Sequence, residues 1–435
     1  MRAFRAAAGK TLSQQTVDRE GIDDNNRREL GRKIILDLLA AHARDADERG
    51  AGGGFDADYQ QRLSEAVFNS LFGLGRLQPL VDNPELENIE IIGCDRVHLI
   101  YADGRIEEGP AVADSDEELI EHLQFLAARA GQTERPFSPS NPDLDLRLPG
   151  GARLAASAWT TPRPTVVIRR HRLVDVDLDD LVRIGMLDAG LAGFLRAAVR
   201  GRRSIVVAGG QGAGKTTLVR ALCNEIGPME SIGTMETEYE LHLHEMGTPD
   251  NLRHPRCKAW EARPGSGERG PDGRRLGEIT LDDIMWRSLR MNLDRVIVGE
   301  VRGREVFPMI KAMQAGSGSL STTHANSAHA AIERLVTCAT EAGPQVSETW
   351  AYRQVAQHID LIVQVAYDYA EKGPRARYIS EVIAVEPGED ARPAVTDVYV
   401  PGTDGRARPK VLPQWLRSLS QWGADLSVFR GEGVA

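Results

Sequence analysis

The segment SIVVAGGQGAGKTTLVRAL, residues 204–222, joins an apolar run, a glycine-rich turn and a stretch with helical spacing. It satisfies the pattern GxxxxGK[ST], with Lys215 and Thr216 at the start of the expected helix. Backbone N–H groups of such a loop surround phosphate, the lysine reaches the terminal phosphates and the threonine hydroxyl binds Mg²⁺. The residues predicted to hold the nucleotide are Gly209, Gly210, Gln211, Gly212, Ala213, Gly214, Lys215, Thr216 and Thr217.

The loop alone does not identify the reaction, because it occurs in ATPase motors, kinases and GTPases alike. Carboxylates elsewhere in the chain are needed to distinguish these classes. The apolar segment RVIVGE ends in Glu300, which we expect to bind Mg²⁺ together with Thr216, or to hold its water. The usual aspartate position is Gly299, so Glu300 must act alone there. In TMETEYELHL, Glu236, Glu238 and Glu240 alternate at the end of a predicted strand, which would place their carboxylates on one face. Glu236, nearest the sheet, is the better general-base candidate. A solvated acidic rim is the alternative.

Histidines occur at two places near these carboxylates. The segment SLSTTHAN leads along a strand to His324, which in a parallel sheet would neighbour Glu300 at the carboxyl edge, where ligands bind. We therefore predict a sensor of the terminal phosphate, against the alternative of a structural histidine. His242 and His244 have no further ligands at metal spacing, so we interpret them as surface residues.

The elements that must position these residues alternate between strand and helix from LDDLVRIG onward, which predicts a mostly parallel sheet covered on both faces. Upstream, LENIEIIGCDRVHLIYADGRIEEG, DLRLPGGARLAASAW and PTVVIRRHR alternate as strands do, and DYQQRLSEAVFNSLFG has helical spacing. These segments predict a smaller α+β domain before the α/β domain.

The division of the chain follows from these patterns. Polar residues 1 to about 27 are expected to be disordered, a helix follows, and glycines at residues 50–54 form a flexible joint. We predict a flexible and helical N-terminal extension over residues 1–55, an α+β domain over 56–173, and the nucleotide-binding α/β domain with a C-terminal extension over 174–435.

Composition limits the class of protein. With 41% hydrophobic and 27% charged residues and no apolar run near the roughly 20 residues of a membrane helix, the chain is expected to stay in the cytoplasm. Its start lacks a secretory signal pattern. A net charge of −10 weighs against a protein whose main role is wrapping nucleic acid. The four cysteines form no CxxC pair, so we expect reduced thiols rather than a zinc site or a disulfide framework.

Four segments, GGQGAGKTT, METEYEL, RVIVGEVRG and STTHAN, in this order resemble the four boxes of the type II and type IV secretion ATPase superfamily. The resemblance is closest to CpaF-type ATPases of Flp or Tad pilus systems. It extends to LFGLGRLQPLVDNPELENIEI, LRLPGGARL, VVIRRH and YISEV, over about residues 69–382. One departure is Thr237, where the second box usually carries aspartate.

The resemblance implies a RecA-like domain that hydrolyses ATP with Mg²⁺, preceded by the smaller domain, in a homo-hexamer. Closure of the domains would push on an integral membrane platform protein, which places the chain at the cytoplasmic face of the cell membrane without direct contact to nucleic acid. The resemblance also implies that Arg147, Arg153 and Arg169 deliver positive charge to the terminal phosphate, within the chain or across subunits. Arg302 is a weaker candidate, and ordinary surface arginines are the alternative.

The predicted function is therefore an ATP-driven motor for pilus assembly or protein secretion. The general base stays open between Glu236 and Glu300. The alternative functions are a conjugation-type ATPase for DNA export, a RecA-like nucleic-acid motor stimulated by single-stranded DNA, and a small-molecule kinase.

Overall fold

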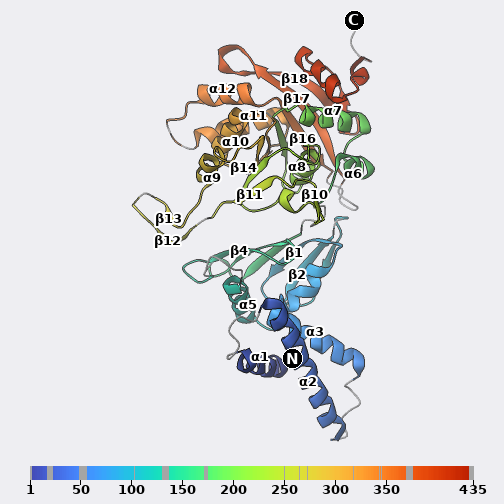
Figure 1. Ribbon diagram of the computed structural model, residues 1–435, viewed down its shortest axis with the longest axis vertical. Coiled ribbons are helices and arrows are strands. Elements are labelled where there is room, and N and C mark those ends of the chain that lie inside the picture. Colours follow the sequence, from blue (N-terminus) through green and yellow to red (C-terminus); the bar gives the residue numbers. More distant parts are fainter. Residues whose placement is uncertain are drawn as a thin grey trace. The chain divides into compact units, whose positions relative to one another are not determined.

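The computed structural model describes most of the chain, in the segments 2–16, 23–48, 56–101, 103–129, 137–170, 175–248, 250–263, 265–271, 273–316, 318–341, 343, 345–368 and 376–430. The chain divides into two units, Met1–Arg172 and Leu173–Ala435, each with its own sheet (Figure 1). The joint expected at residues 50–54 lies outside the described residues.

The first unit contains a six-stranded antiparallel sheet in the order β3-β2-β1-β6-β5-β4. Its strands are β1 (Leu86–Ile92), β2 (Arg96–Tyr101), β3 (Ile106–Glu108), β4 (Asp143–Arg147), β5 (Arg153–Ser157) and β6 (Thr165–Arg169). Apolar side chains at every second position, such as Leu146, Leu154 and Ile168, share one core with helix α5 (Asp116–Arg129). On β4, the opposite face carries Asp143, Asp145 and Arg147.

Three further helices of this unit, α1 (Arg2–Thr16), α2 (Asp24–Glu48) and α3 (Ala57–Phe72), share a second, smaller core. The expectation of disorder over the first 27 residues is wrong for 2–16 and for 24–27, which are helical. Ala8 and Leu12 lie one helical turn apart, and both are buried against the other two helices. The helix at 2–16 is therefore stabilised by contacts with α2 and α3, which the polar local composition did not predict.

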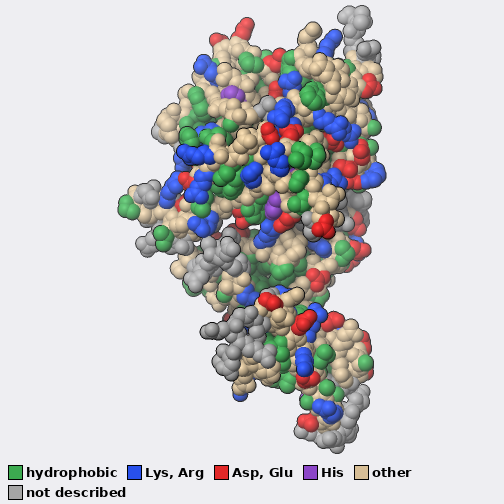
Figure 2. All heavy atoms as spheres, viewed as in Figure 1, with side chains coloured by type: hydrophobic (Ala, Val, Ile, Leu, Met, Phe, Trp, Pro, Cys, Tyr) green, Lys and Arg blue, Asp and Glu red, His purple; other side chains and the backbone are tan. Residues whose placement is uncertain are grey.

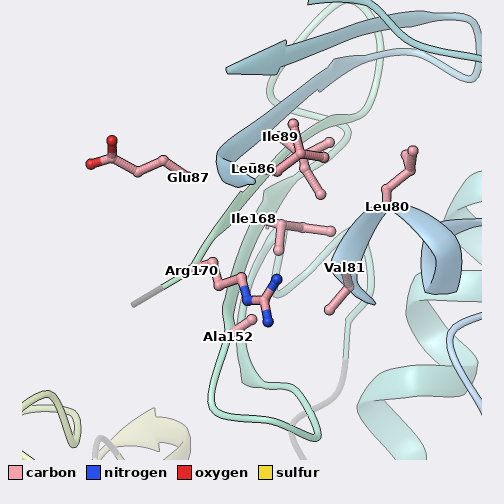
Figure 3. A pocket seen from close by; sticks show the side chains of 8 residues that line it. All are labelled: Leu80, Val81, Leu86, Glu87, Ile89, Ala152, Ile168 and Arg170. Atoms are coloured by element: carbon pink, nitrogen blue, oxygen red, sulfur yellow. The ribbon is translucent and has the colours of Figure 1, made fainter. Parts of the chain in front are cut away.

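A small cavity in the first unit lies between the sheet and the short helix α4 (Gln78–Asp82), as Figure 3 shows. Leu80, Val81 and Ile168 line it, and Arg170 closes its rim by donating from Nη1 to the Asn83 carbonyl at 2.6 Å. Its volume of about 10 Å³ accommodates at most one water molecule, so it is a packing void rather than a ligand site.

The second unit is built on a nine-stranded sheet in the order β11-β8-β14-β15-β7-β16-β17-β18-β19. The run from β11 to β16 is parallel, and the remaining strands are antiparallel, so the predicted mostly parallel α/β sheet is confirmed. The strands are β7 (Ile205–Gly209), β8 (Ile232–Glu236), β11 (Cys257–Glu261), β14 (Arg295–Val301), β15 (Leu320–His324), β16 (Leu361–Tyr367), β17 (Arg377–Pro387), β18 (Pro393–Pro401) and β19 (Ala407–Pro409).

Helices cover both faces of this sheet, because its central strands are apolar at successive positions. On β7, Ile205 and Val207 belong to one core, and Val206 and Ala208 belong to the other. The first core includes α6 (Leu178–Arg183), α7 (Ala189–Arg200) and α8 (Lys215–Cys223), and the second includes α9 (Leu281–Ser288), α10 (Val306–Ala315), α11 (Ala328–Thr340) and α12 (Glu348–His358).

Shorter elements complete the second unit. They are the strand pairs β9 (Gly247–Thr248) with β10 (Asn251–Leu252) and β12 (Ser266–Arg269) with β13 (Arg275–Leu276), and the 3₁₀ segments Leu243–Glu245, Glu389–Ala391, Gln414–Trp422 and Ser427–Arg430. Leu416 and Leu419 anchor the C-terminal extension in the first of the two cores. None of the helices in the described part of the chain is long and apolar enough to cross a membrane.

Candidate nucleotide-binding site

The glycine-rich loop between β7 and α8 has backbone requirements that explain its sequence. Gly212 and Gly214 adopt φ of +73° and +97°, in the left-handed region that side chains other than glycine rarely occupy. At Gly209, an added Cβ would lie 2.5 Å from the carbonyl oxygen of Val365 on β16. The N-cap residue of α8 is Gly214, which makes no side-chain cap hydrogen bond, and N–H groups at such a helix start can bind an anion.

Lys215, the first residue of α8, folds back over this loop. Its side chain is 7% exposed, and Nζ donates to the carbonyls of Gly209 at 3.2 Å and Gly210 at 3.0 Å. The same Nζ lies 3.3 Å from Nδ1 of His324. The ammonium group is therefore held at the loop itself, where it would meet the terminal phosphates of a nucleotide.

The pairing of β14 with β15 brings His324 beside Glu300, the neighbourhood expected from a parallel sheet. Nε2 of His324 lies 2.7 Å from Oε1 of Glu300. The other carboxylate oxygen accepts from Arg302, whose Nε and Nη2 lie 2.8 and 2.7 Å away. The carboxylate of Glu300 is thus oriented from both sides, at the sheet edge that carries the loop.

His324 has a pKa below its ordinary value because of burial and the neighbouring Lys215 ammonium, although Glu300 acts in the opposite direction. The neutral ring protonated at Nε2 satisfies both contacts, since Nε2–H donates to Glu300 while Nδ1 accepts from Lys215. A second ring proton at Nδ1 would face the ammonium group. The geometry therefore favours neutral His324 and links Lys215 to Glu300.

Glu236 is the last residue of β8, and its carboxylate is directed into the protein. The residue is 2% exposed, and Oε1 accepts from the N–H groups of Glu240 at 2.8 Å and Leu241 at 2.9 Å. The expectation that three glutamates alternate along one strand face is wrong, because the strand ends at Glu236 and the chain turns. Glu238 and Glu240 belong to that turn, which Glu236 stabilises.

Glu240 reaches the loop in place of Glu236. Its Oε2 accepts from Oγ1 of Thr216 at 2.9 Å, and its carbonyl accepts from Arg220. Glu240 was predicted only as one of three alternating glutamates, because nothing in the local spacing shows that the chain reverses after β8. Thr216 therefore contacts Glu240, whereas Glu300, its expected co-ligand, is paired with His324 and Arg302.

The Thr216 hydroxyl and the Glu240 carboxylate suit Mg²⁺, a hard cation that prefers oxygen ligands. Mg²⁺ usually retains several waters and shares the remaining positions with substrate phosphates. The described residues include no cluster of three or more His, Cys, Asp or Glu side chains that could hold a metal ion by themselves. The donor set therefore fits a cation that is bound together with a nucleotide.

His242 differs from its prediction, and Arg377 is a residue of the site that the sequence did not indicate. His242 is not a surface residue: it is 4% exposed, has φ of +52° at the start of a 3₁₀ turn, and its Nδ1 lies 3.2 Å from Oε2 of Glu245. Arg377, at the start of β17, donates from Nε to the carbonyl of Gly212 at 2.9 Å. No motif pointed to Arg377, because only the sheet brings it to the loop.

The three arginines of the first unit lie in one row. Arg147 on β4 is the register partner of Arg153 on β5, which is in turn the partner of Arg169 on β6. The neighbouring residues Leu146 and Leu154 are buried, so by strand alternation the arginines lie on the opposite face of the sheet. Three guanidinium groups thus share one face and one position along their strands.

This chain is similar to known proteins in sequence and in fold. The family model described as type II/IV secretion system protein matches residues 96–382. An uncharacterized protein of Methanocaldococcus jannaschii is 31% identical over 268 residues, which cover 61% of this chain and 45% of that protein. The chain thus spans less than half the length of this relative. The type IV secretion system protein PtlH of Bordetella pertussis is 30% identical over 286 residues, covering 60% of this chain and 80% of PtlH.

Among solved structures, the X-ray structure of the Legionella pneumophila ATPase DotB is similar to this chain with a TM-score of 0.50. The match covers 74% of this chain and 82% of DotB at 17% sequence identity. At that identity the likeness concerns the fold alone, a small domain preceding an α/β core.

Proposed function

Because this chain belongs to the type II/IV secretion system protein family, we propose that it is an ATP-hydrolysing motor that powers pilus assembly or protein secretion at the cytoplasmic face of a membrane. The observation that carries this proposal is the convergence of Lys215, His324 and Glu300 at the glycine-rich loop. A cation for the phosphates and an oriented carboxylate for water are the groups that phosphoryl transfer to water requires.

The proposed roles follow from burial and contacts. Glu300 positions the attacking water, since its side chain is 17% exposed and lies at the sheet edge. Glu236, 2% exposed and bonded to two backbone N–H groups, supports the turn that carries Glu240. Thr216 and Glu240 would hold Mg²⁺, which when bound neutralises charge on the phosphates, and Glu300 stays a predicted ligand of the ion or of its water.

The arginine row is proposed to act on the same phosphates. A guanidinium group is always charged and can bind two oxygens at once, as needed where charge redistributes on a transferring phosphoryl group. Arg147, Arg153 and Arg169 would supply it either within the chain or to a neighbouring subunit of a homo-hexamer. Their common position on three adjacent strands supports a joint role.

Two finer assignments are part of the proposal. The resemblance of the four boxes and of YISEV favours the CpaF-type ATPases of Flp or Tad pilus systems, with an integral membrane platform protein as partner. Direct contact with nucleic acid is not expected. Basic side chains lie interspersed with acidic ones over the face seen in Figure 2, rather than in one large basic field.

The experiment that tests the function measures phosphate release from ATP by the purified full chain with Mg²⁺. Lys215→Ala should abolish release while the circular dichroism spectrum stays unchanged, because the substitution removes the charge at the terminal phosphates. Undiminished release by Lys215→Ala would refute the proposed site. Phosphate on an acceptor molecule would indicate a kinase, and strong stimulation by single-stranded DNA would indicate a nucleic-acid motor.

A further inference from the structure

The loop at residues 209–214 is contacted by a pair of residues that belongs to neither the motif nor the acidic strands. Tyr367, the last residue of β16, and Arg377, the first residue of β17, are register partners in the antiparallel ladder between these strands. Because β16 also pairs with β7 in parallel, with Val365 opposite Gly209, this ladder ends beside the loop. Two side chains at the ends of paired strands are therefore available to hold it.

Arg377 holds the loop through its backbone. Nε donates to the carbonyl of Gly212 at 2.9 Å, and an added Cβ at Gly214 would lie 3.5 Å from Cδ of Arg377. The aliphatic part of Arg377 thus packs beside Gly214 at the start of α8, while its guanidinium group binds the carbonyl of Gly212. Both glycines have positive φ, so the contact fixes the part of the loop with the most backbone freedom.

Tyr367 and its strand contact the other half of the loop. An added Cβ at Gly210 would lie 3.4 Å from Cε1 of Tyr367, and one at Gly209 would lie 2.5 Å from the carbonyl oxygen of Val365. Together with Arg377, the ends of β16 and β17 touch the loop at Gly209, Gly210 and Gly212. The loop residues reached by these contacts are glycines of the turn, which precede Lys215 and Thr216.

The bond from Arg377 has a consequence for phosphate binding. The carbonyl of Gly212 and the N–H of Ala213 belong to one planar peptide and point in opposite directions. The bond from Arg377 to this carbonyl therefore also fixes the direction of the Ala213 N–H. The nitrogen of Ala213 lies 3.4 Å from the carbonyl oxygen of Gly210, to which it donates. A hydrogen bond of that length is weak, so an anionic oxygen can replace it at little cost.

We propose that Tyr367 and Arg377 are positioning residues that keep the loop in its phosphate-binding form before the nucleotide arrives. Without them, binding would have to order a segment with four glycines among six residues, at a cost in conformational entropy. The pair acts on the affinity for ATP rather than on the chemical step, since it binds the loop through Gly212 and Gly210. This inference rests on the proposed function of the loop.

The test compares full-length variants for binding of a fluorescent ATP analogue with Mg²⁺ and for kcat at saturating ATP. Arg377→Gln should raise Kd about tenfold, the effect of one charge-assisted hydrogen bond, while kcat stays within about twofold. Arg377→Lys keeps the charge and a donor, so its Kd should lie between those of Arg377→Gln and the wild type. Tyr367→Ala should also raise Kd, at an unchanged kcat.

Arg408→Gln is the matched control, because Arg408 lies on β19 of the same sheet and pairs with Asp404 at 2.9 Å. Its Kd should equal that of the wild type. A Kd for Arg377→Gln within twofold of the wild-type value would overturn the inference, and so would a loss of kcat at unchanged Kd. A wild-type chain that does not bind the analogue, or binding that survives Lys215→Ala unchanged, would instead refute the proposed function itself.

Discussion

Gly299 on β14 lies directly against Glu236 on the neighbouring strand β8, so closely that an added Cβ would be 2.9 Å from Cγ and 3.2 Å from Oε1 of the glutamate. Glu236 has little room to move, since it is 2% exposed and bonded to two backbone N–H groups. The contact explains why a glycine stands where an aspartate is usual in such strands. The space for a carboxylate at residue 299 is taken by Glu236.

Gly299→Ala should therefore be destabilising. The added methyl group would press on the buried side chain of Glu236, and overpacking of this kind costs about 1–3 kcal/mol. It would also disturb the turn that carries Glu240. Urea unfolding of the full chain measures the free energy. Gly303→Ala is the control, because the nearest atom to an added Cβ there is Oε2 of Glu305 at 3.8 Å. Equal stabilities of the two variants would show that Glu236 adapts.

Glu300→Gln should keep ATP bound and slow hydrolysis by about 10²-fold or more, because the amide preserves shape but not the carboxylate that orients water. Nucleotide affinity and single-turnover hydrolysis, measured on the same sample, separate the two effects. If affinity falls as far as in Lys215→Ala, Glu300 serves the metal rather than the water.

Lowering the pH should affect His324 only below the ordinary histidine pKa of 6.5, because burial and Lys215 lower its pKa in the folded protein. The unfolded chain then takes up this proton first, so the contribution to stability is complete above pH 6.5 and is lost as the pH falls through the lowered pKa. Urea unfolding at several pH values from 7 to 5 should show a shallower dependence in His324→Gln than in the wild type. If the free energy of unfolding depends on pH in the same way in both proteins, His324 does not contribute to this dependence.

Replacing each arginine of the row by lysine should reduce kcat more than nucleotide affinity, because lysine keeps the charge but not the fork that binds two oxygens. Arginine contributions in phosphoryl-transfer sites reach about 10³-fold or more, so the effect of Arg147→Lys, Arg153→Lys or Arg169→Lys should be large. Arg96→Lys on β2 of the same sheet is the control. Full activity of a chain that begins at residue 175, at equal oligomeric state, would show that the row is not part of the site.

Local patterns in the sequence predicted much of the α/β unit. The loop could be identified because its requirements are local: positive φ at Gly212 and Gly214, close packing at Gly209, and a lysine in the first turn of the helix. Alternation of strands and helices predicted the mostly parallel sheet, and from that sheet the neighbourhood of His324 and Glu300 followed. In the first unit, the ordered helix Arg2–Thr16 was missed because its apolar contacts lie on distant helices.

Only the tertiary structure decided which carboxylate faces the loop and what holds the loop in place. The chain reverses after β8, which directs Glu236 inward and brings Glu240 to Thr216, although their alternating spacing suggested a common strand face. Arg377 contacts Gly212, 165 positions earlier in the sequence, because the sheet order places β16 between β7 and β17. Spacing along the chain determines local conformation, whereas these contacts depend on strand order and chain reversal, which are set by packing of the whole unit.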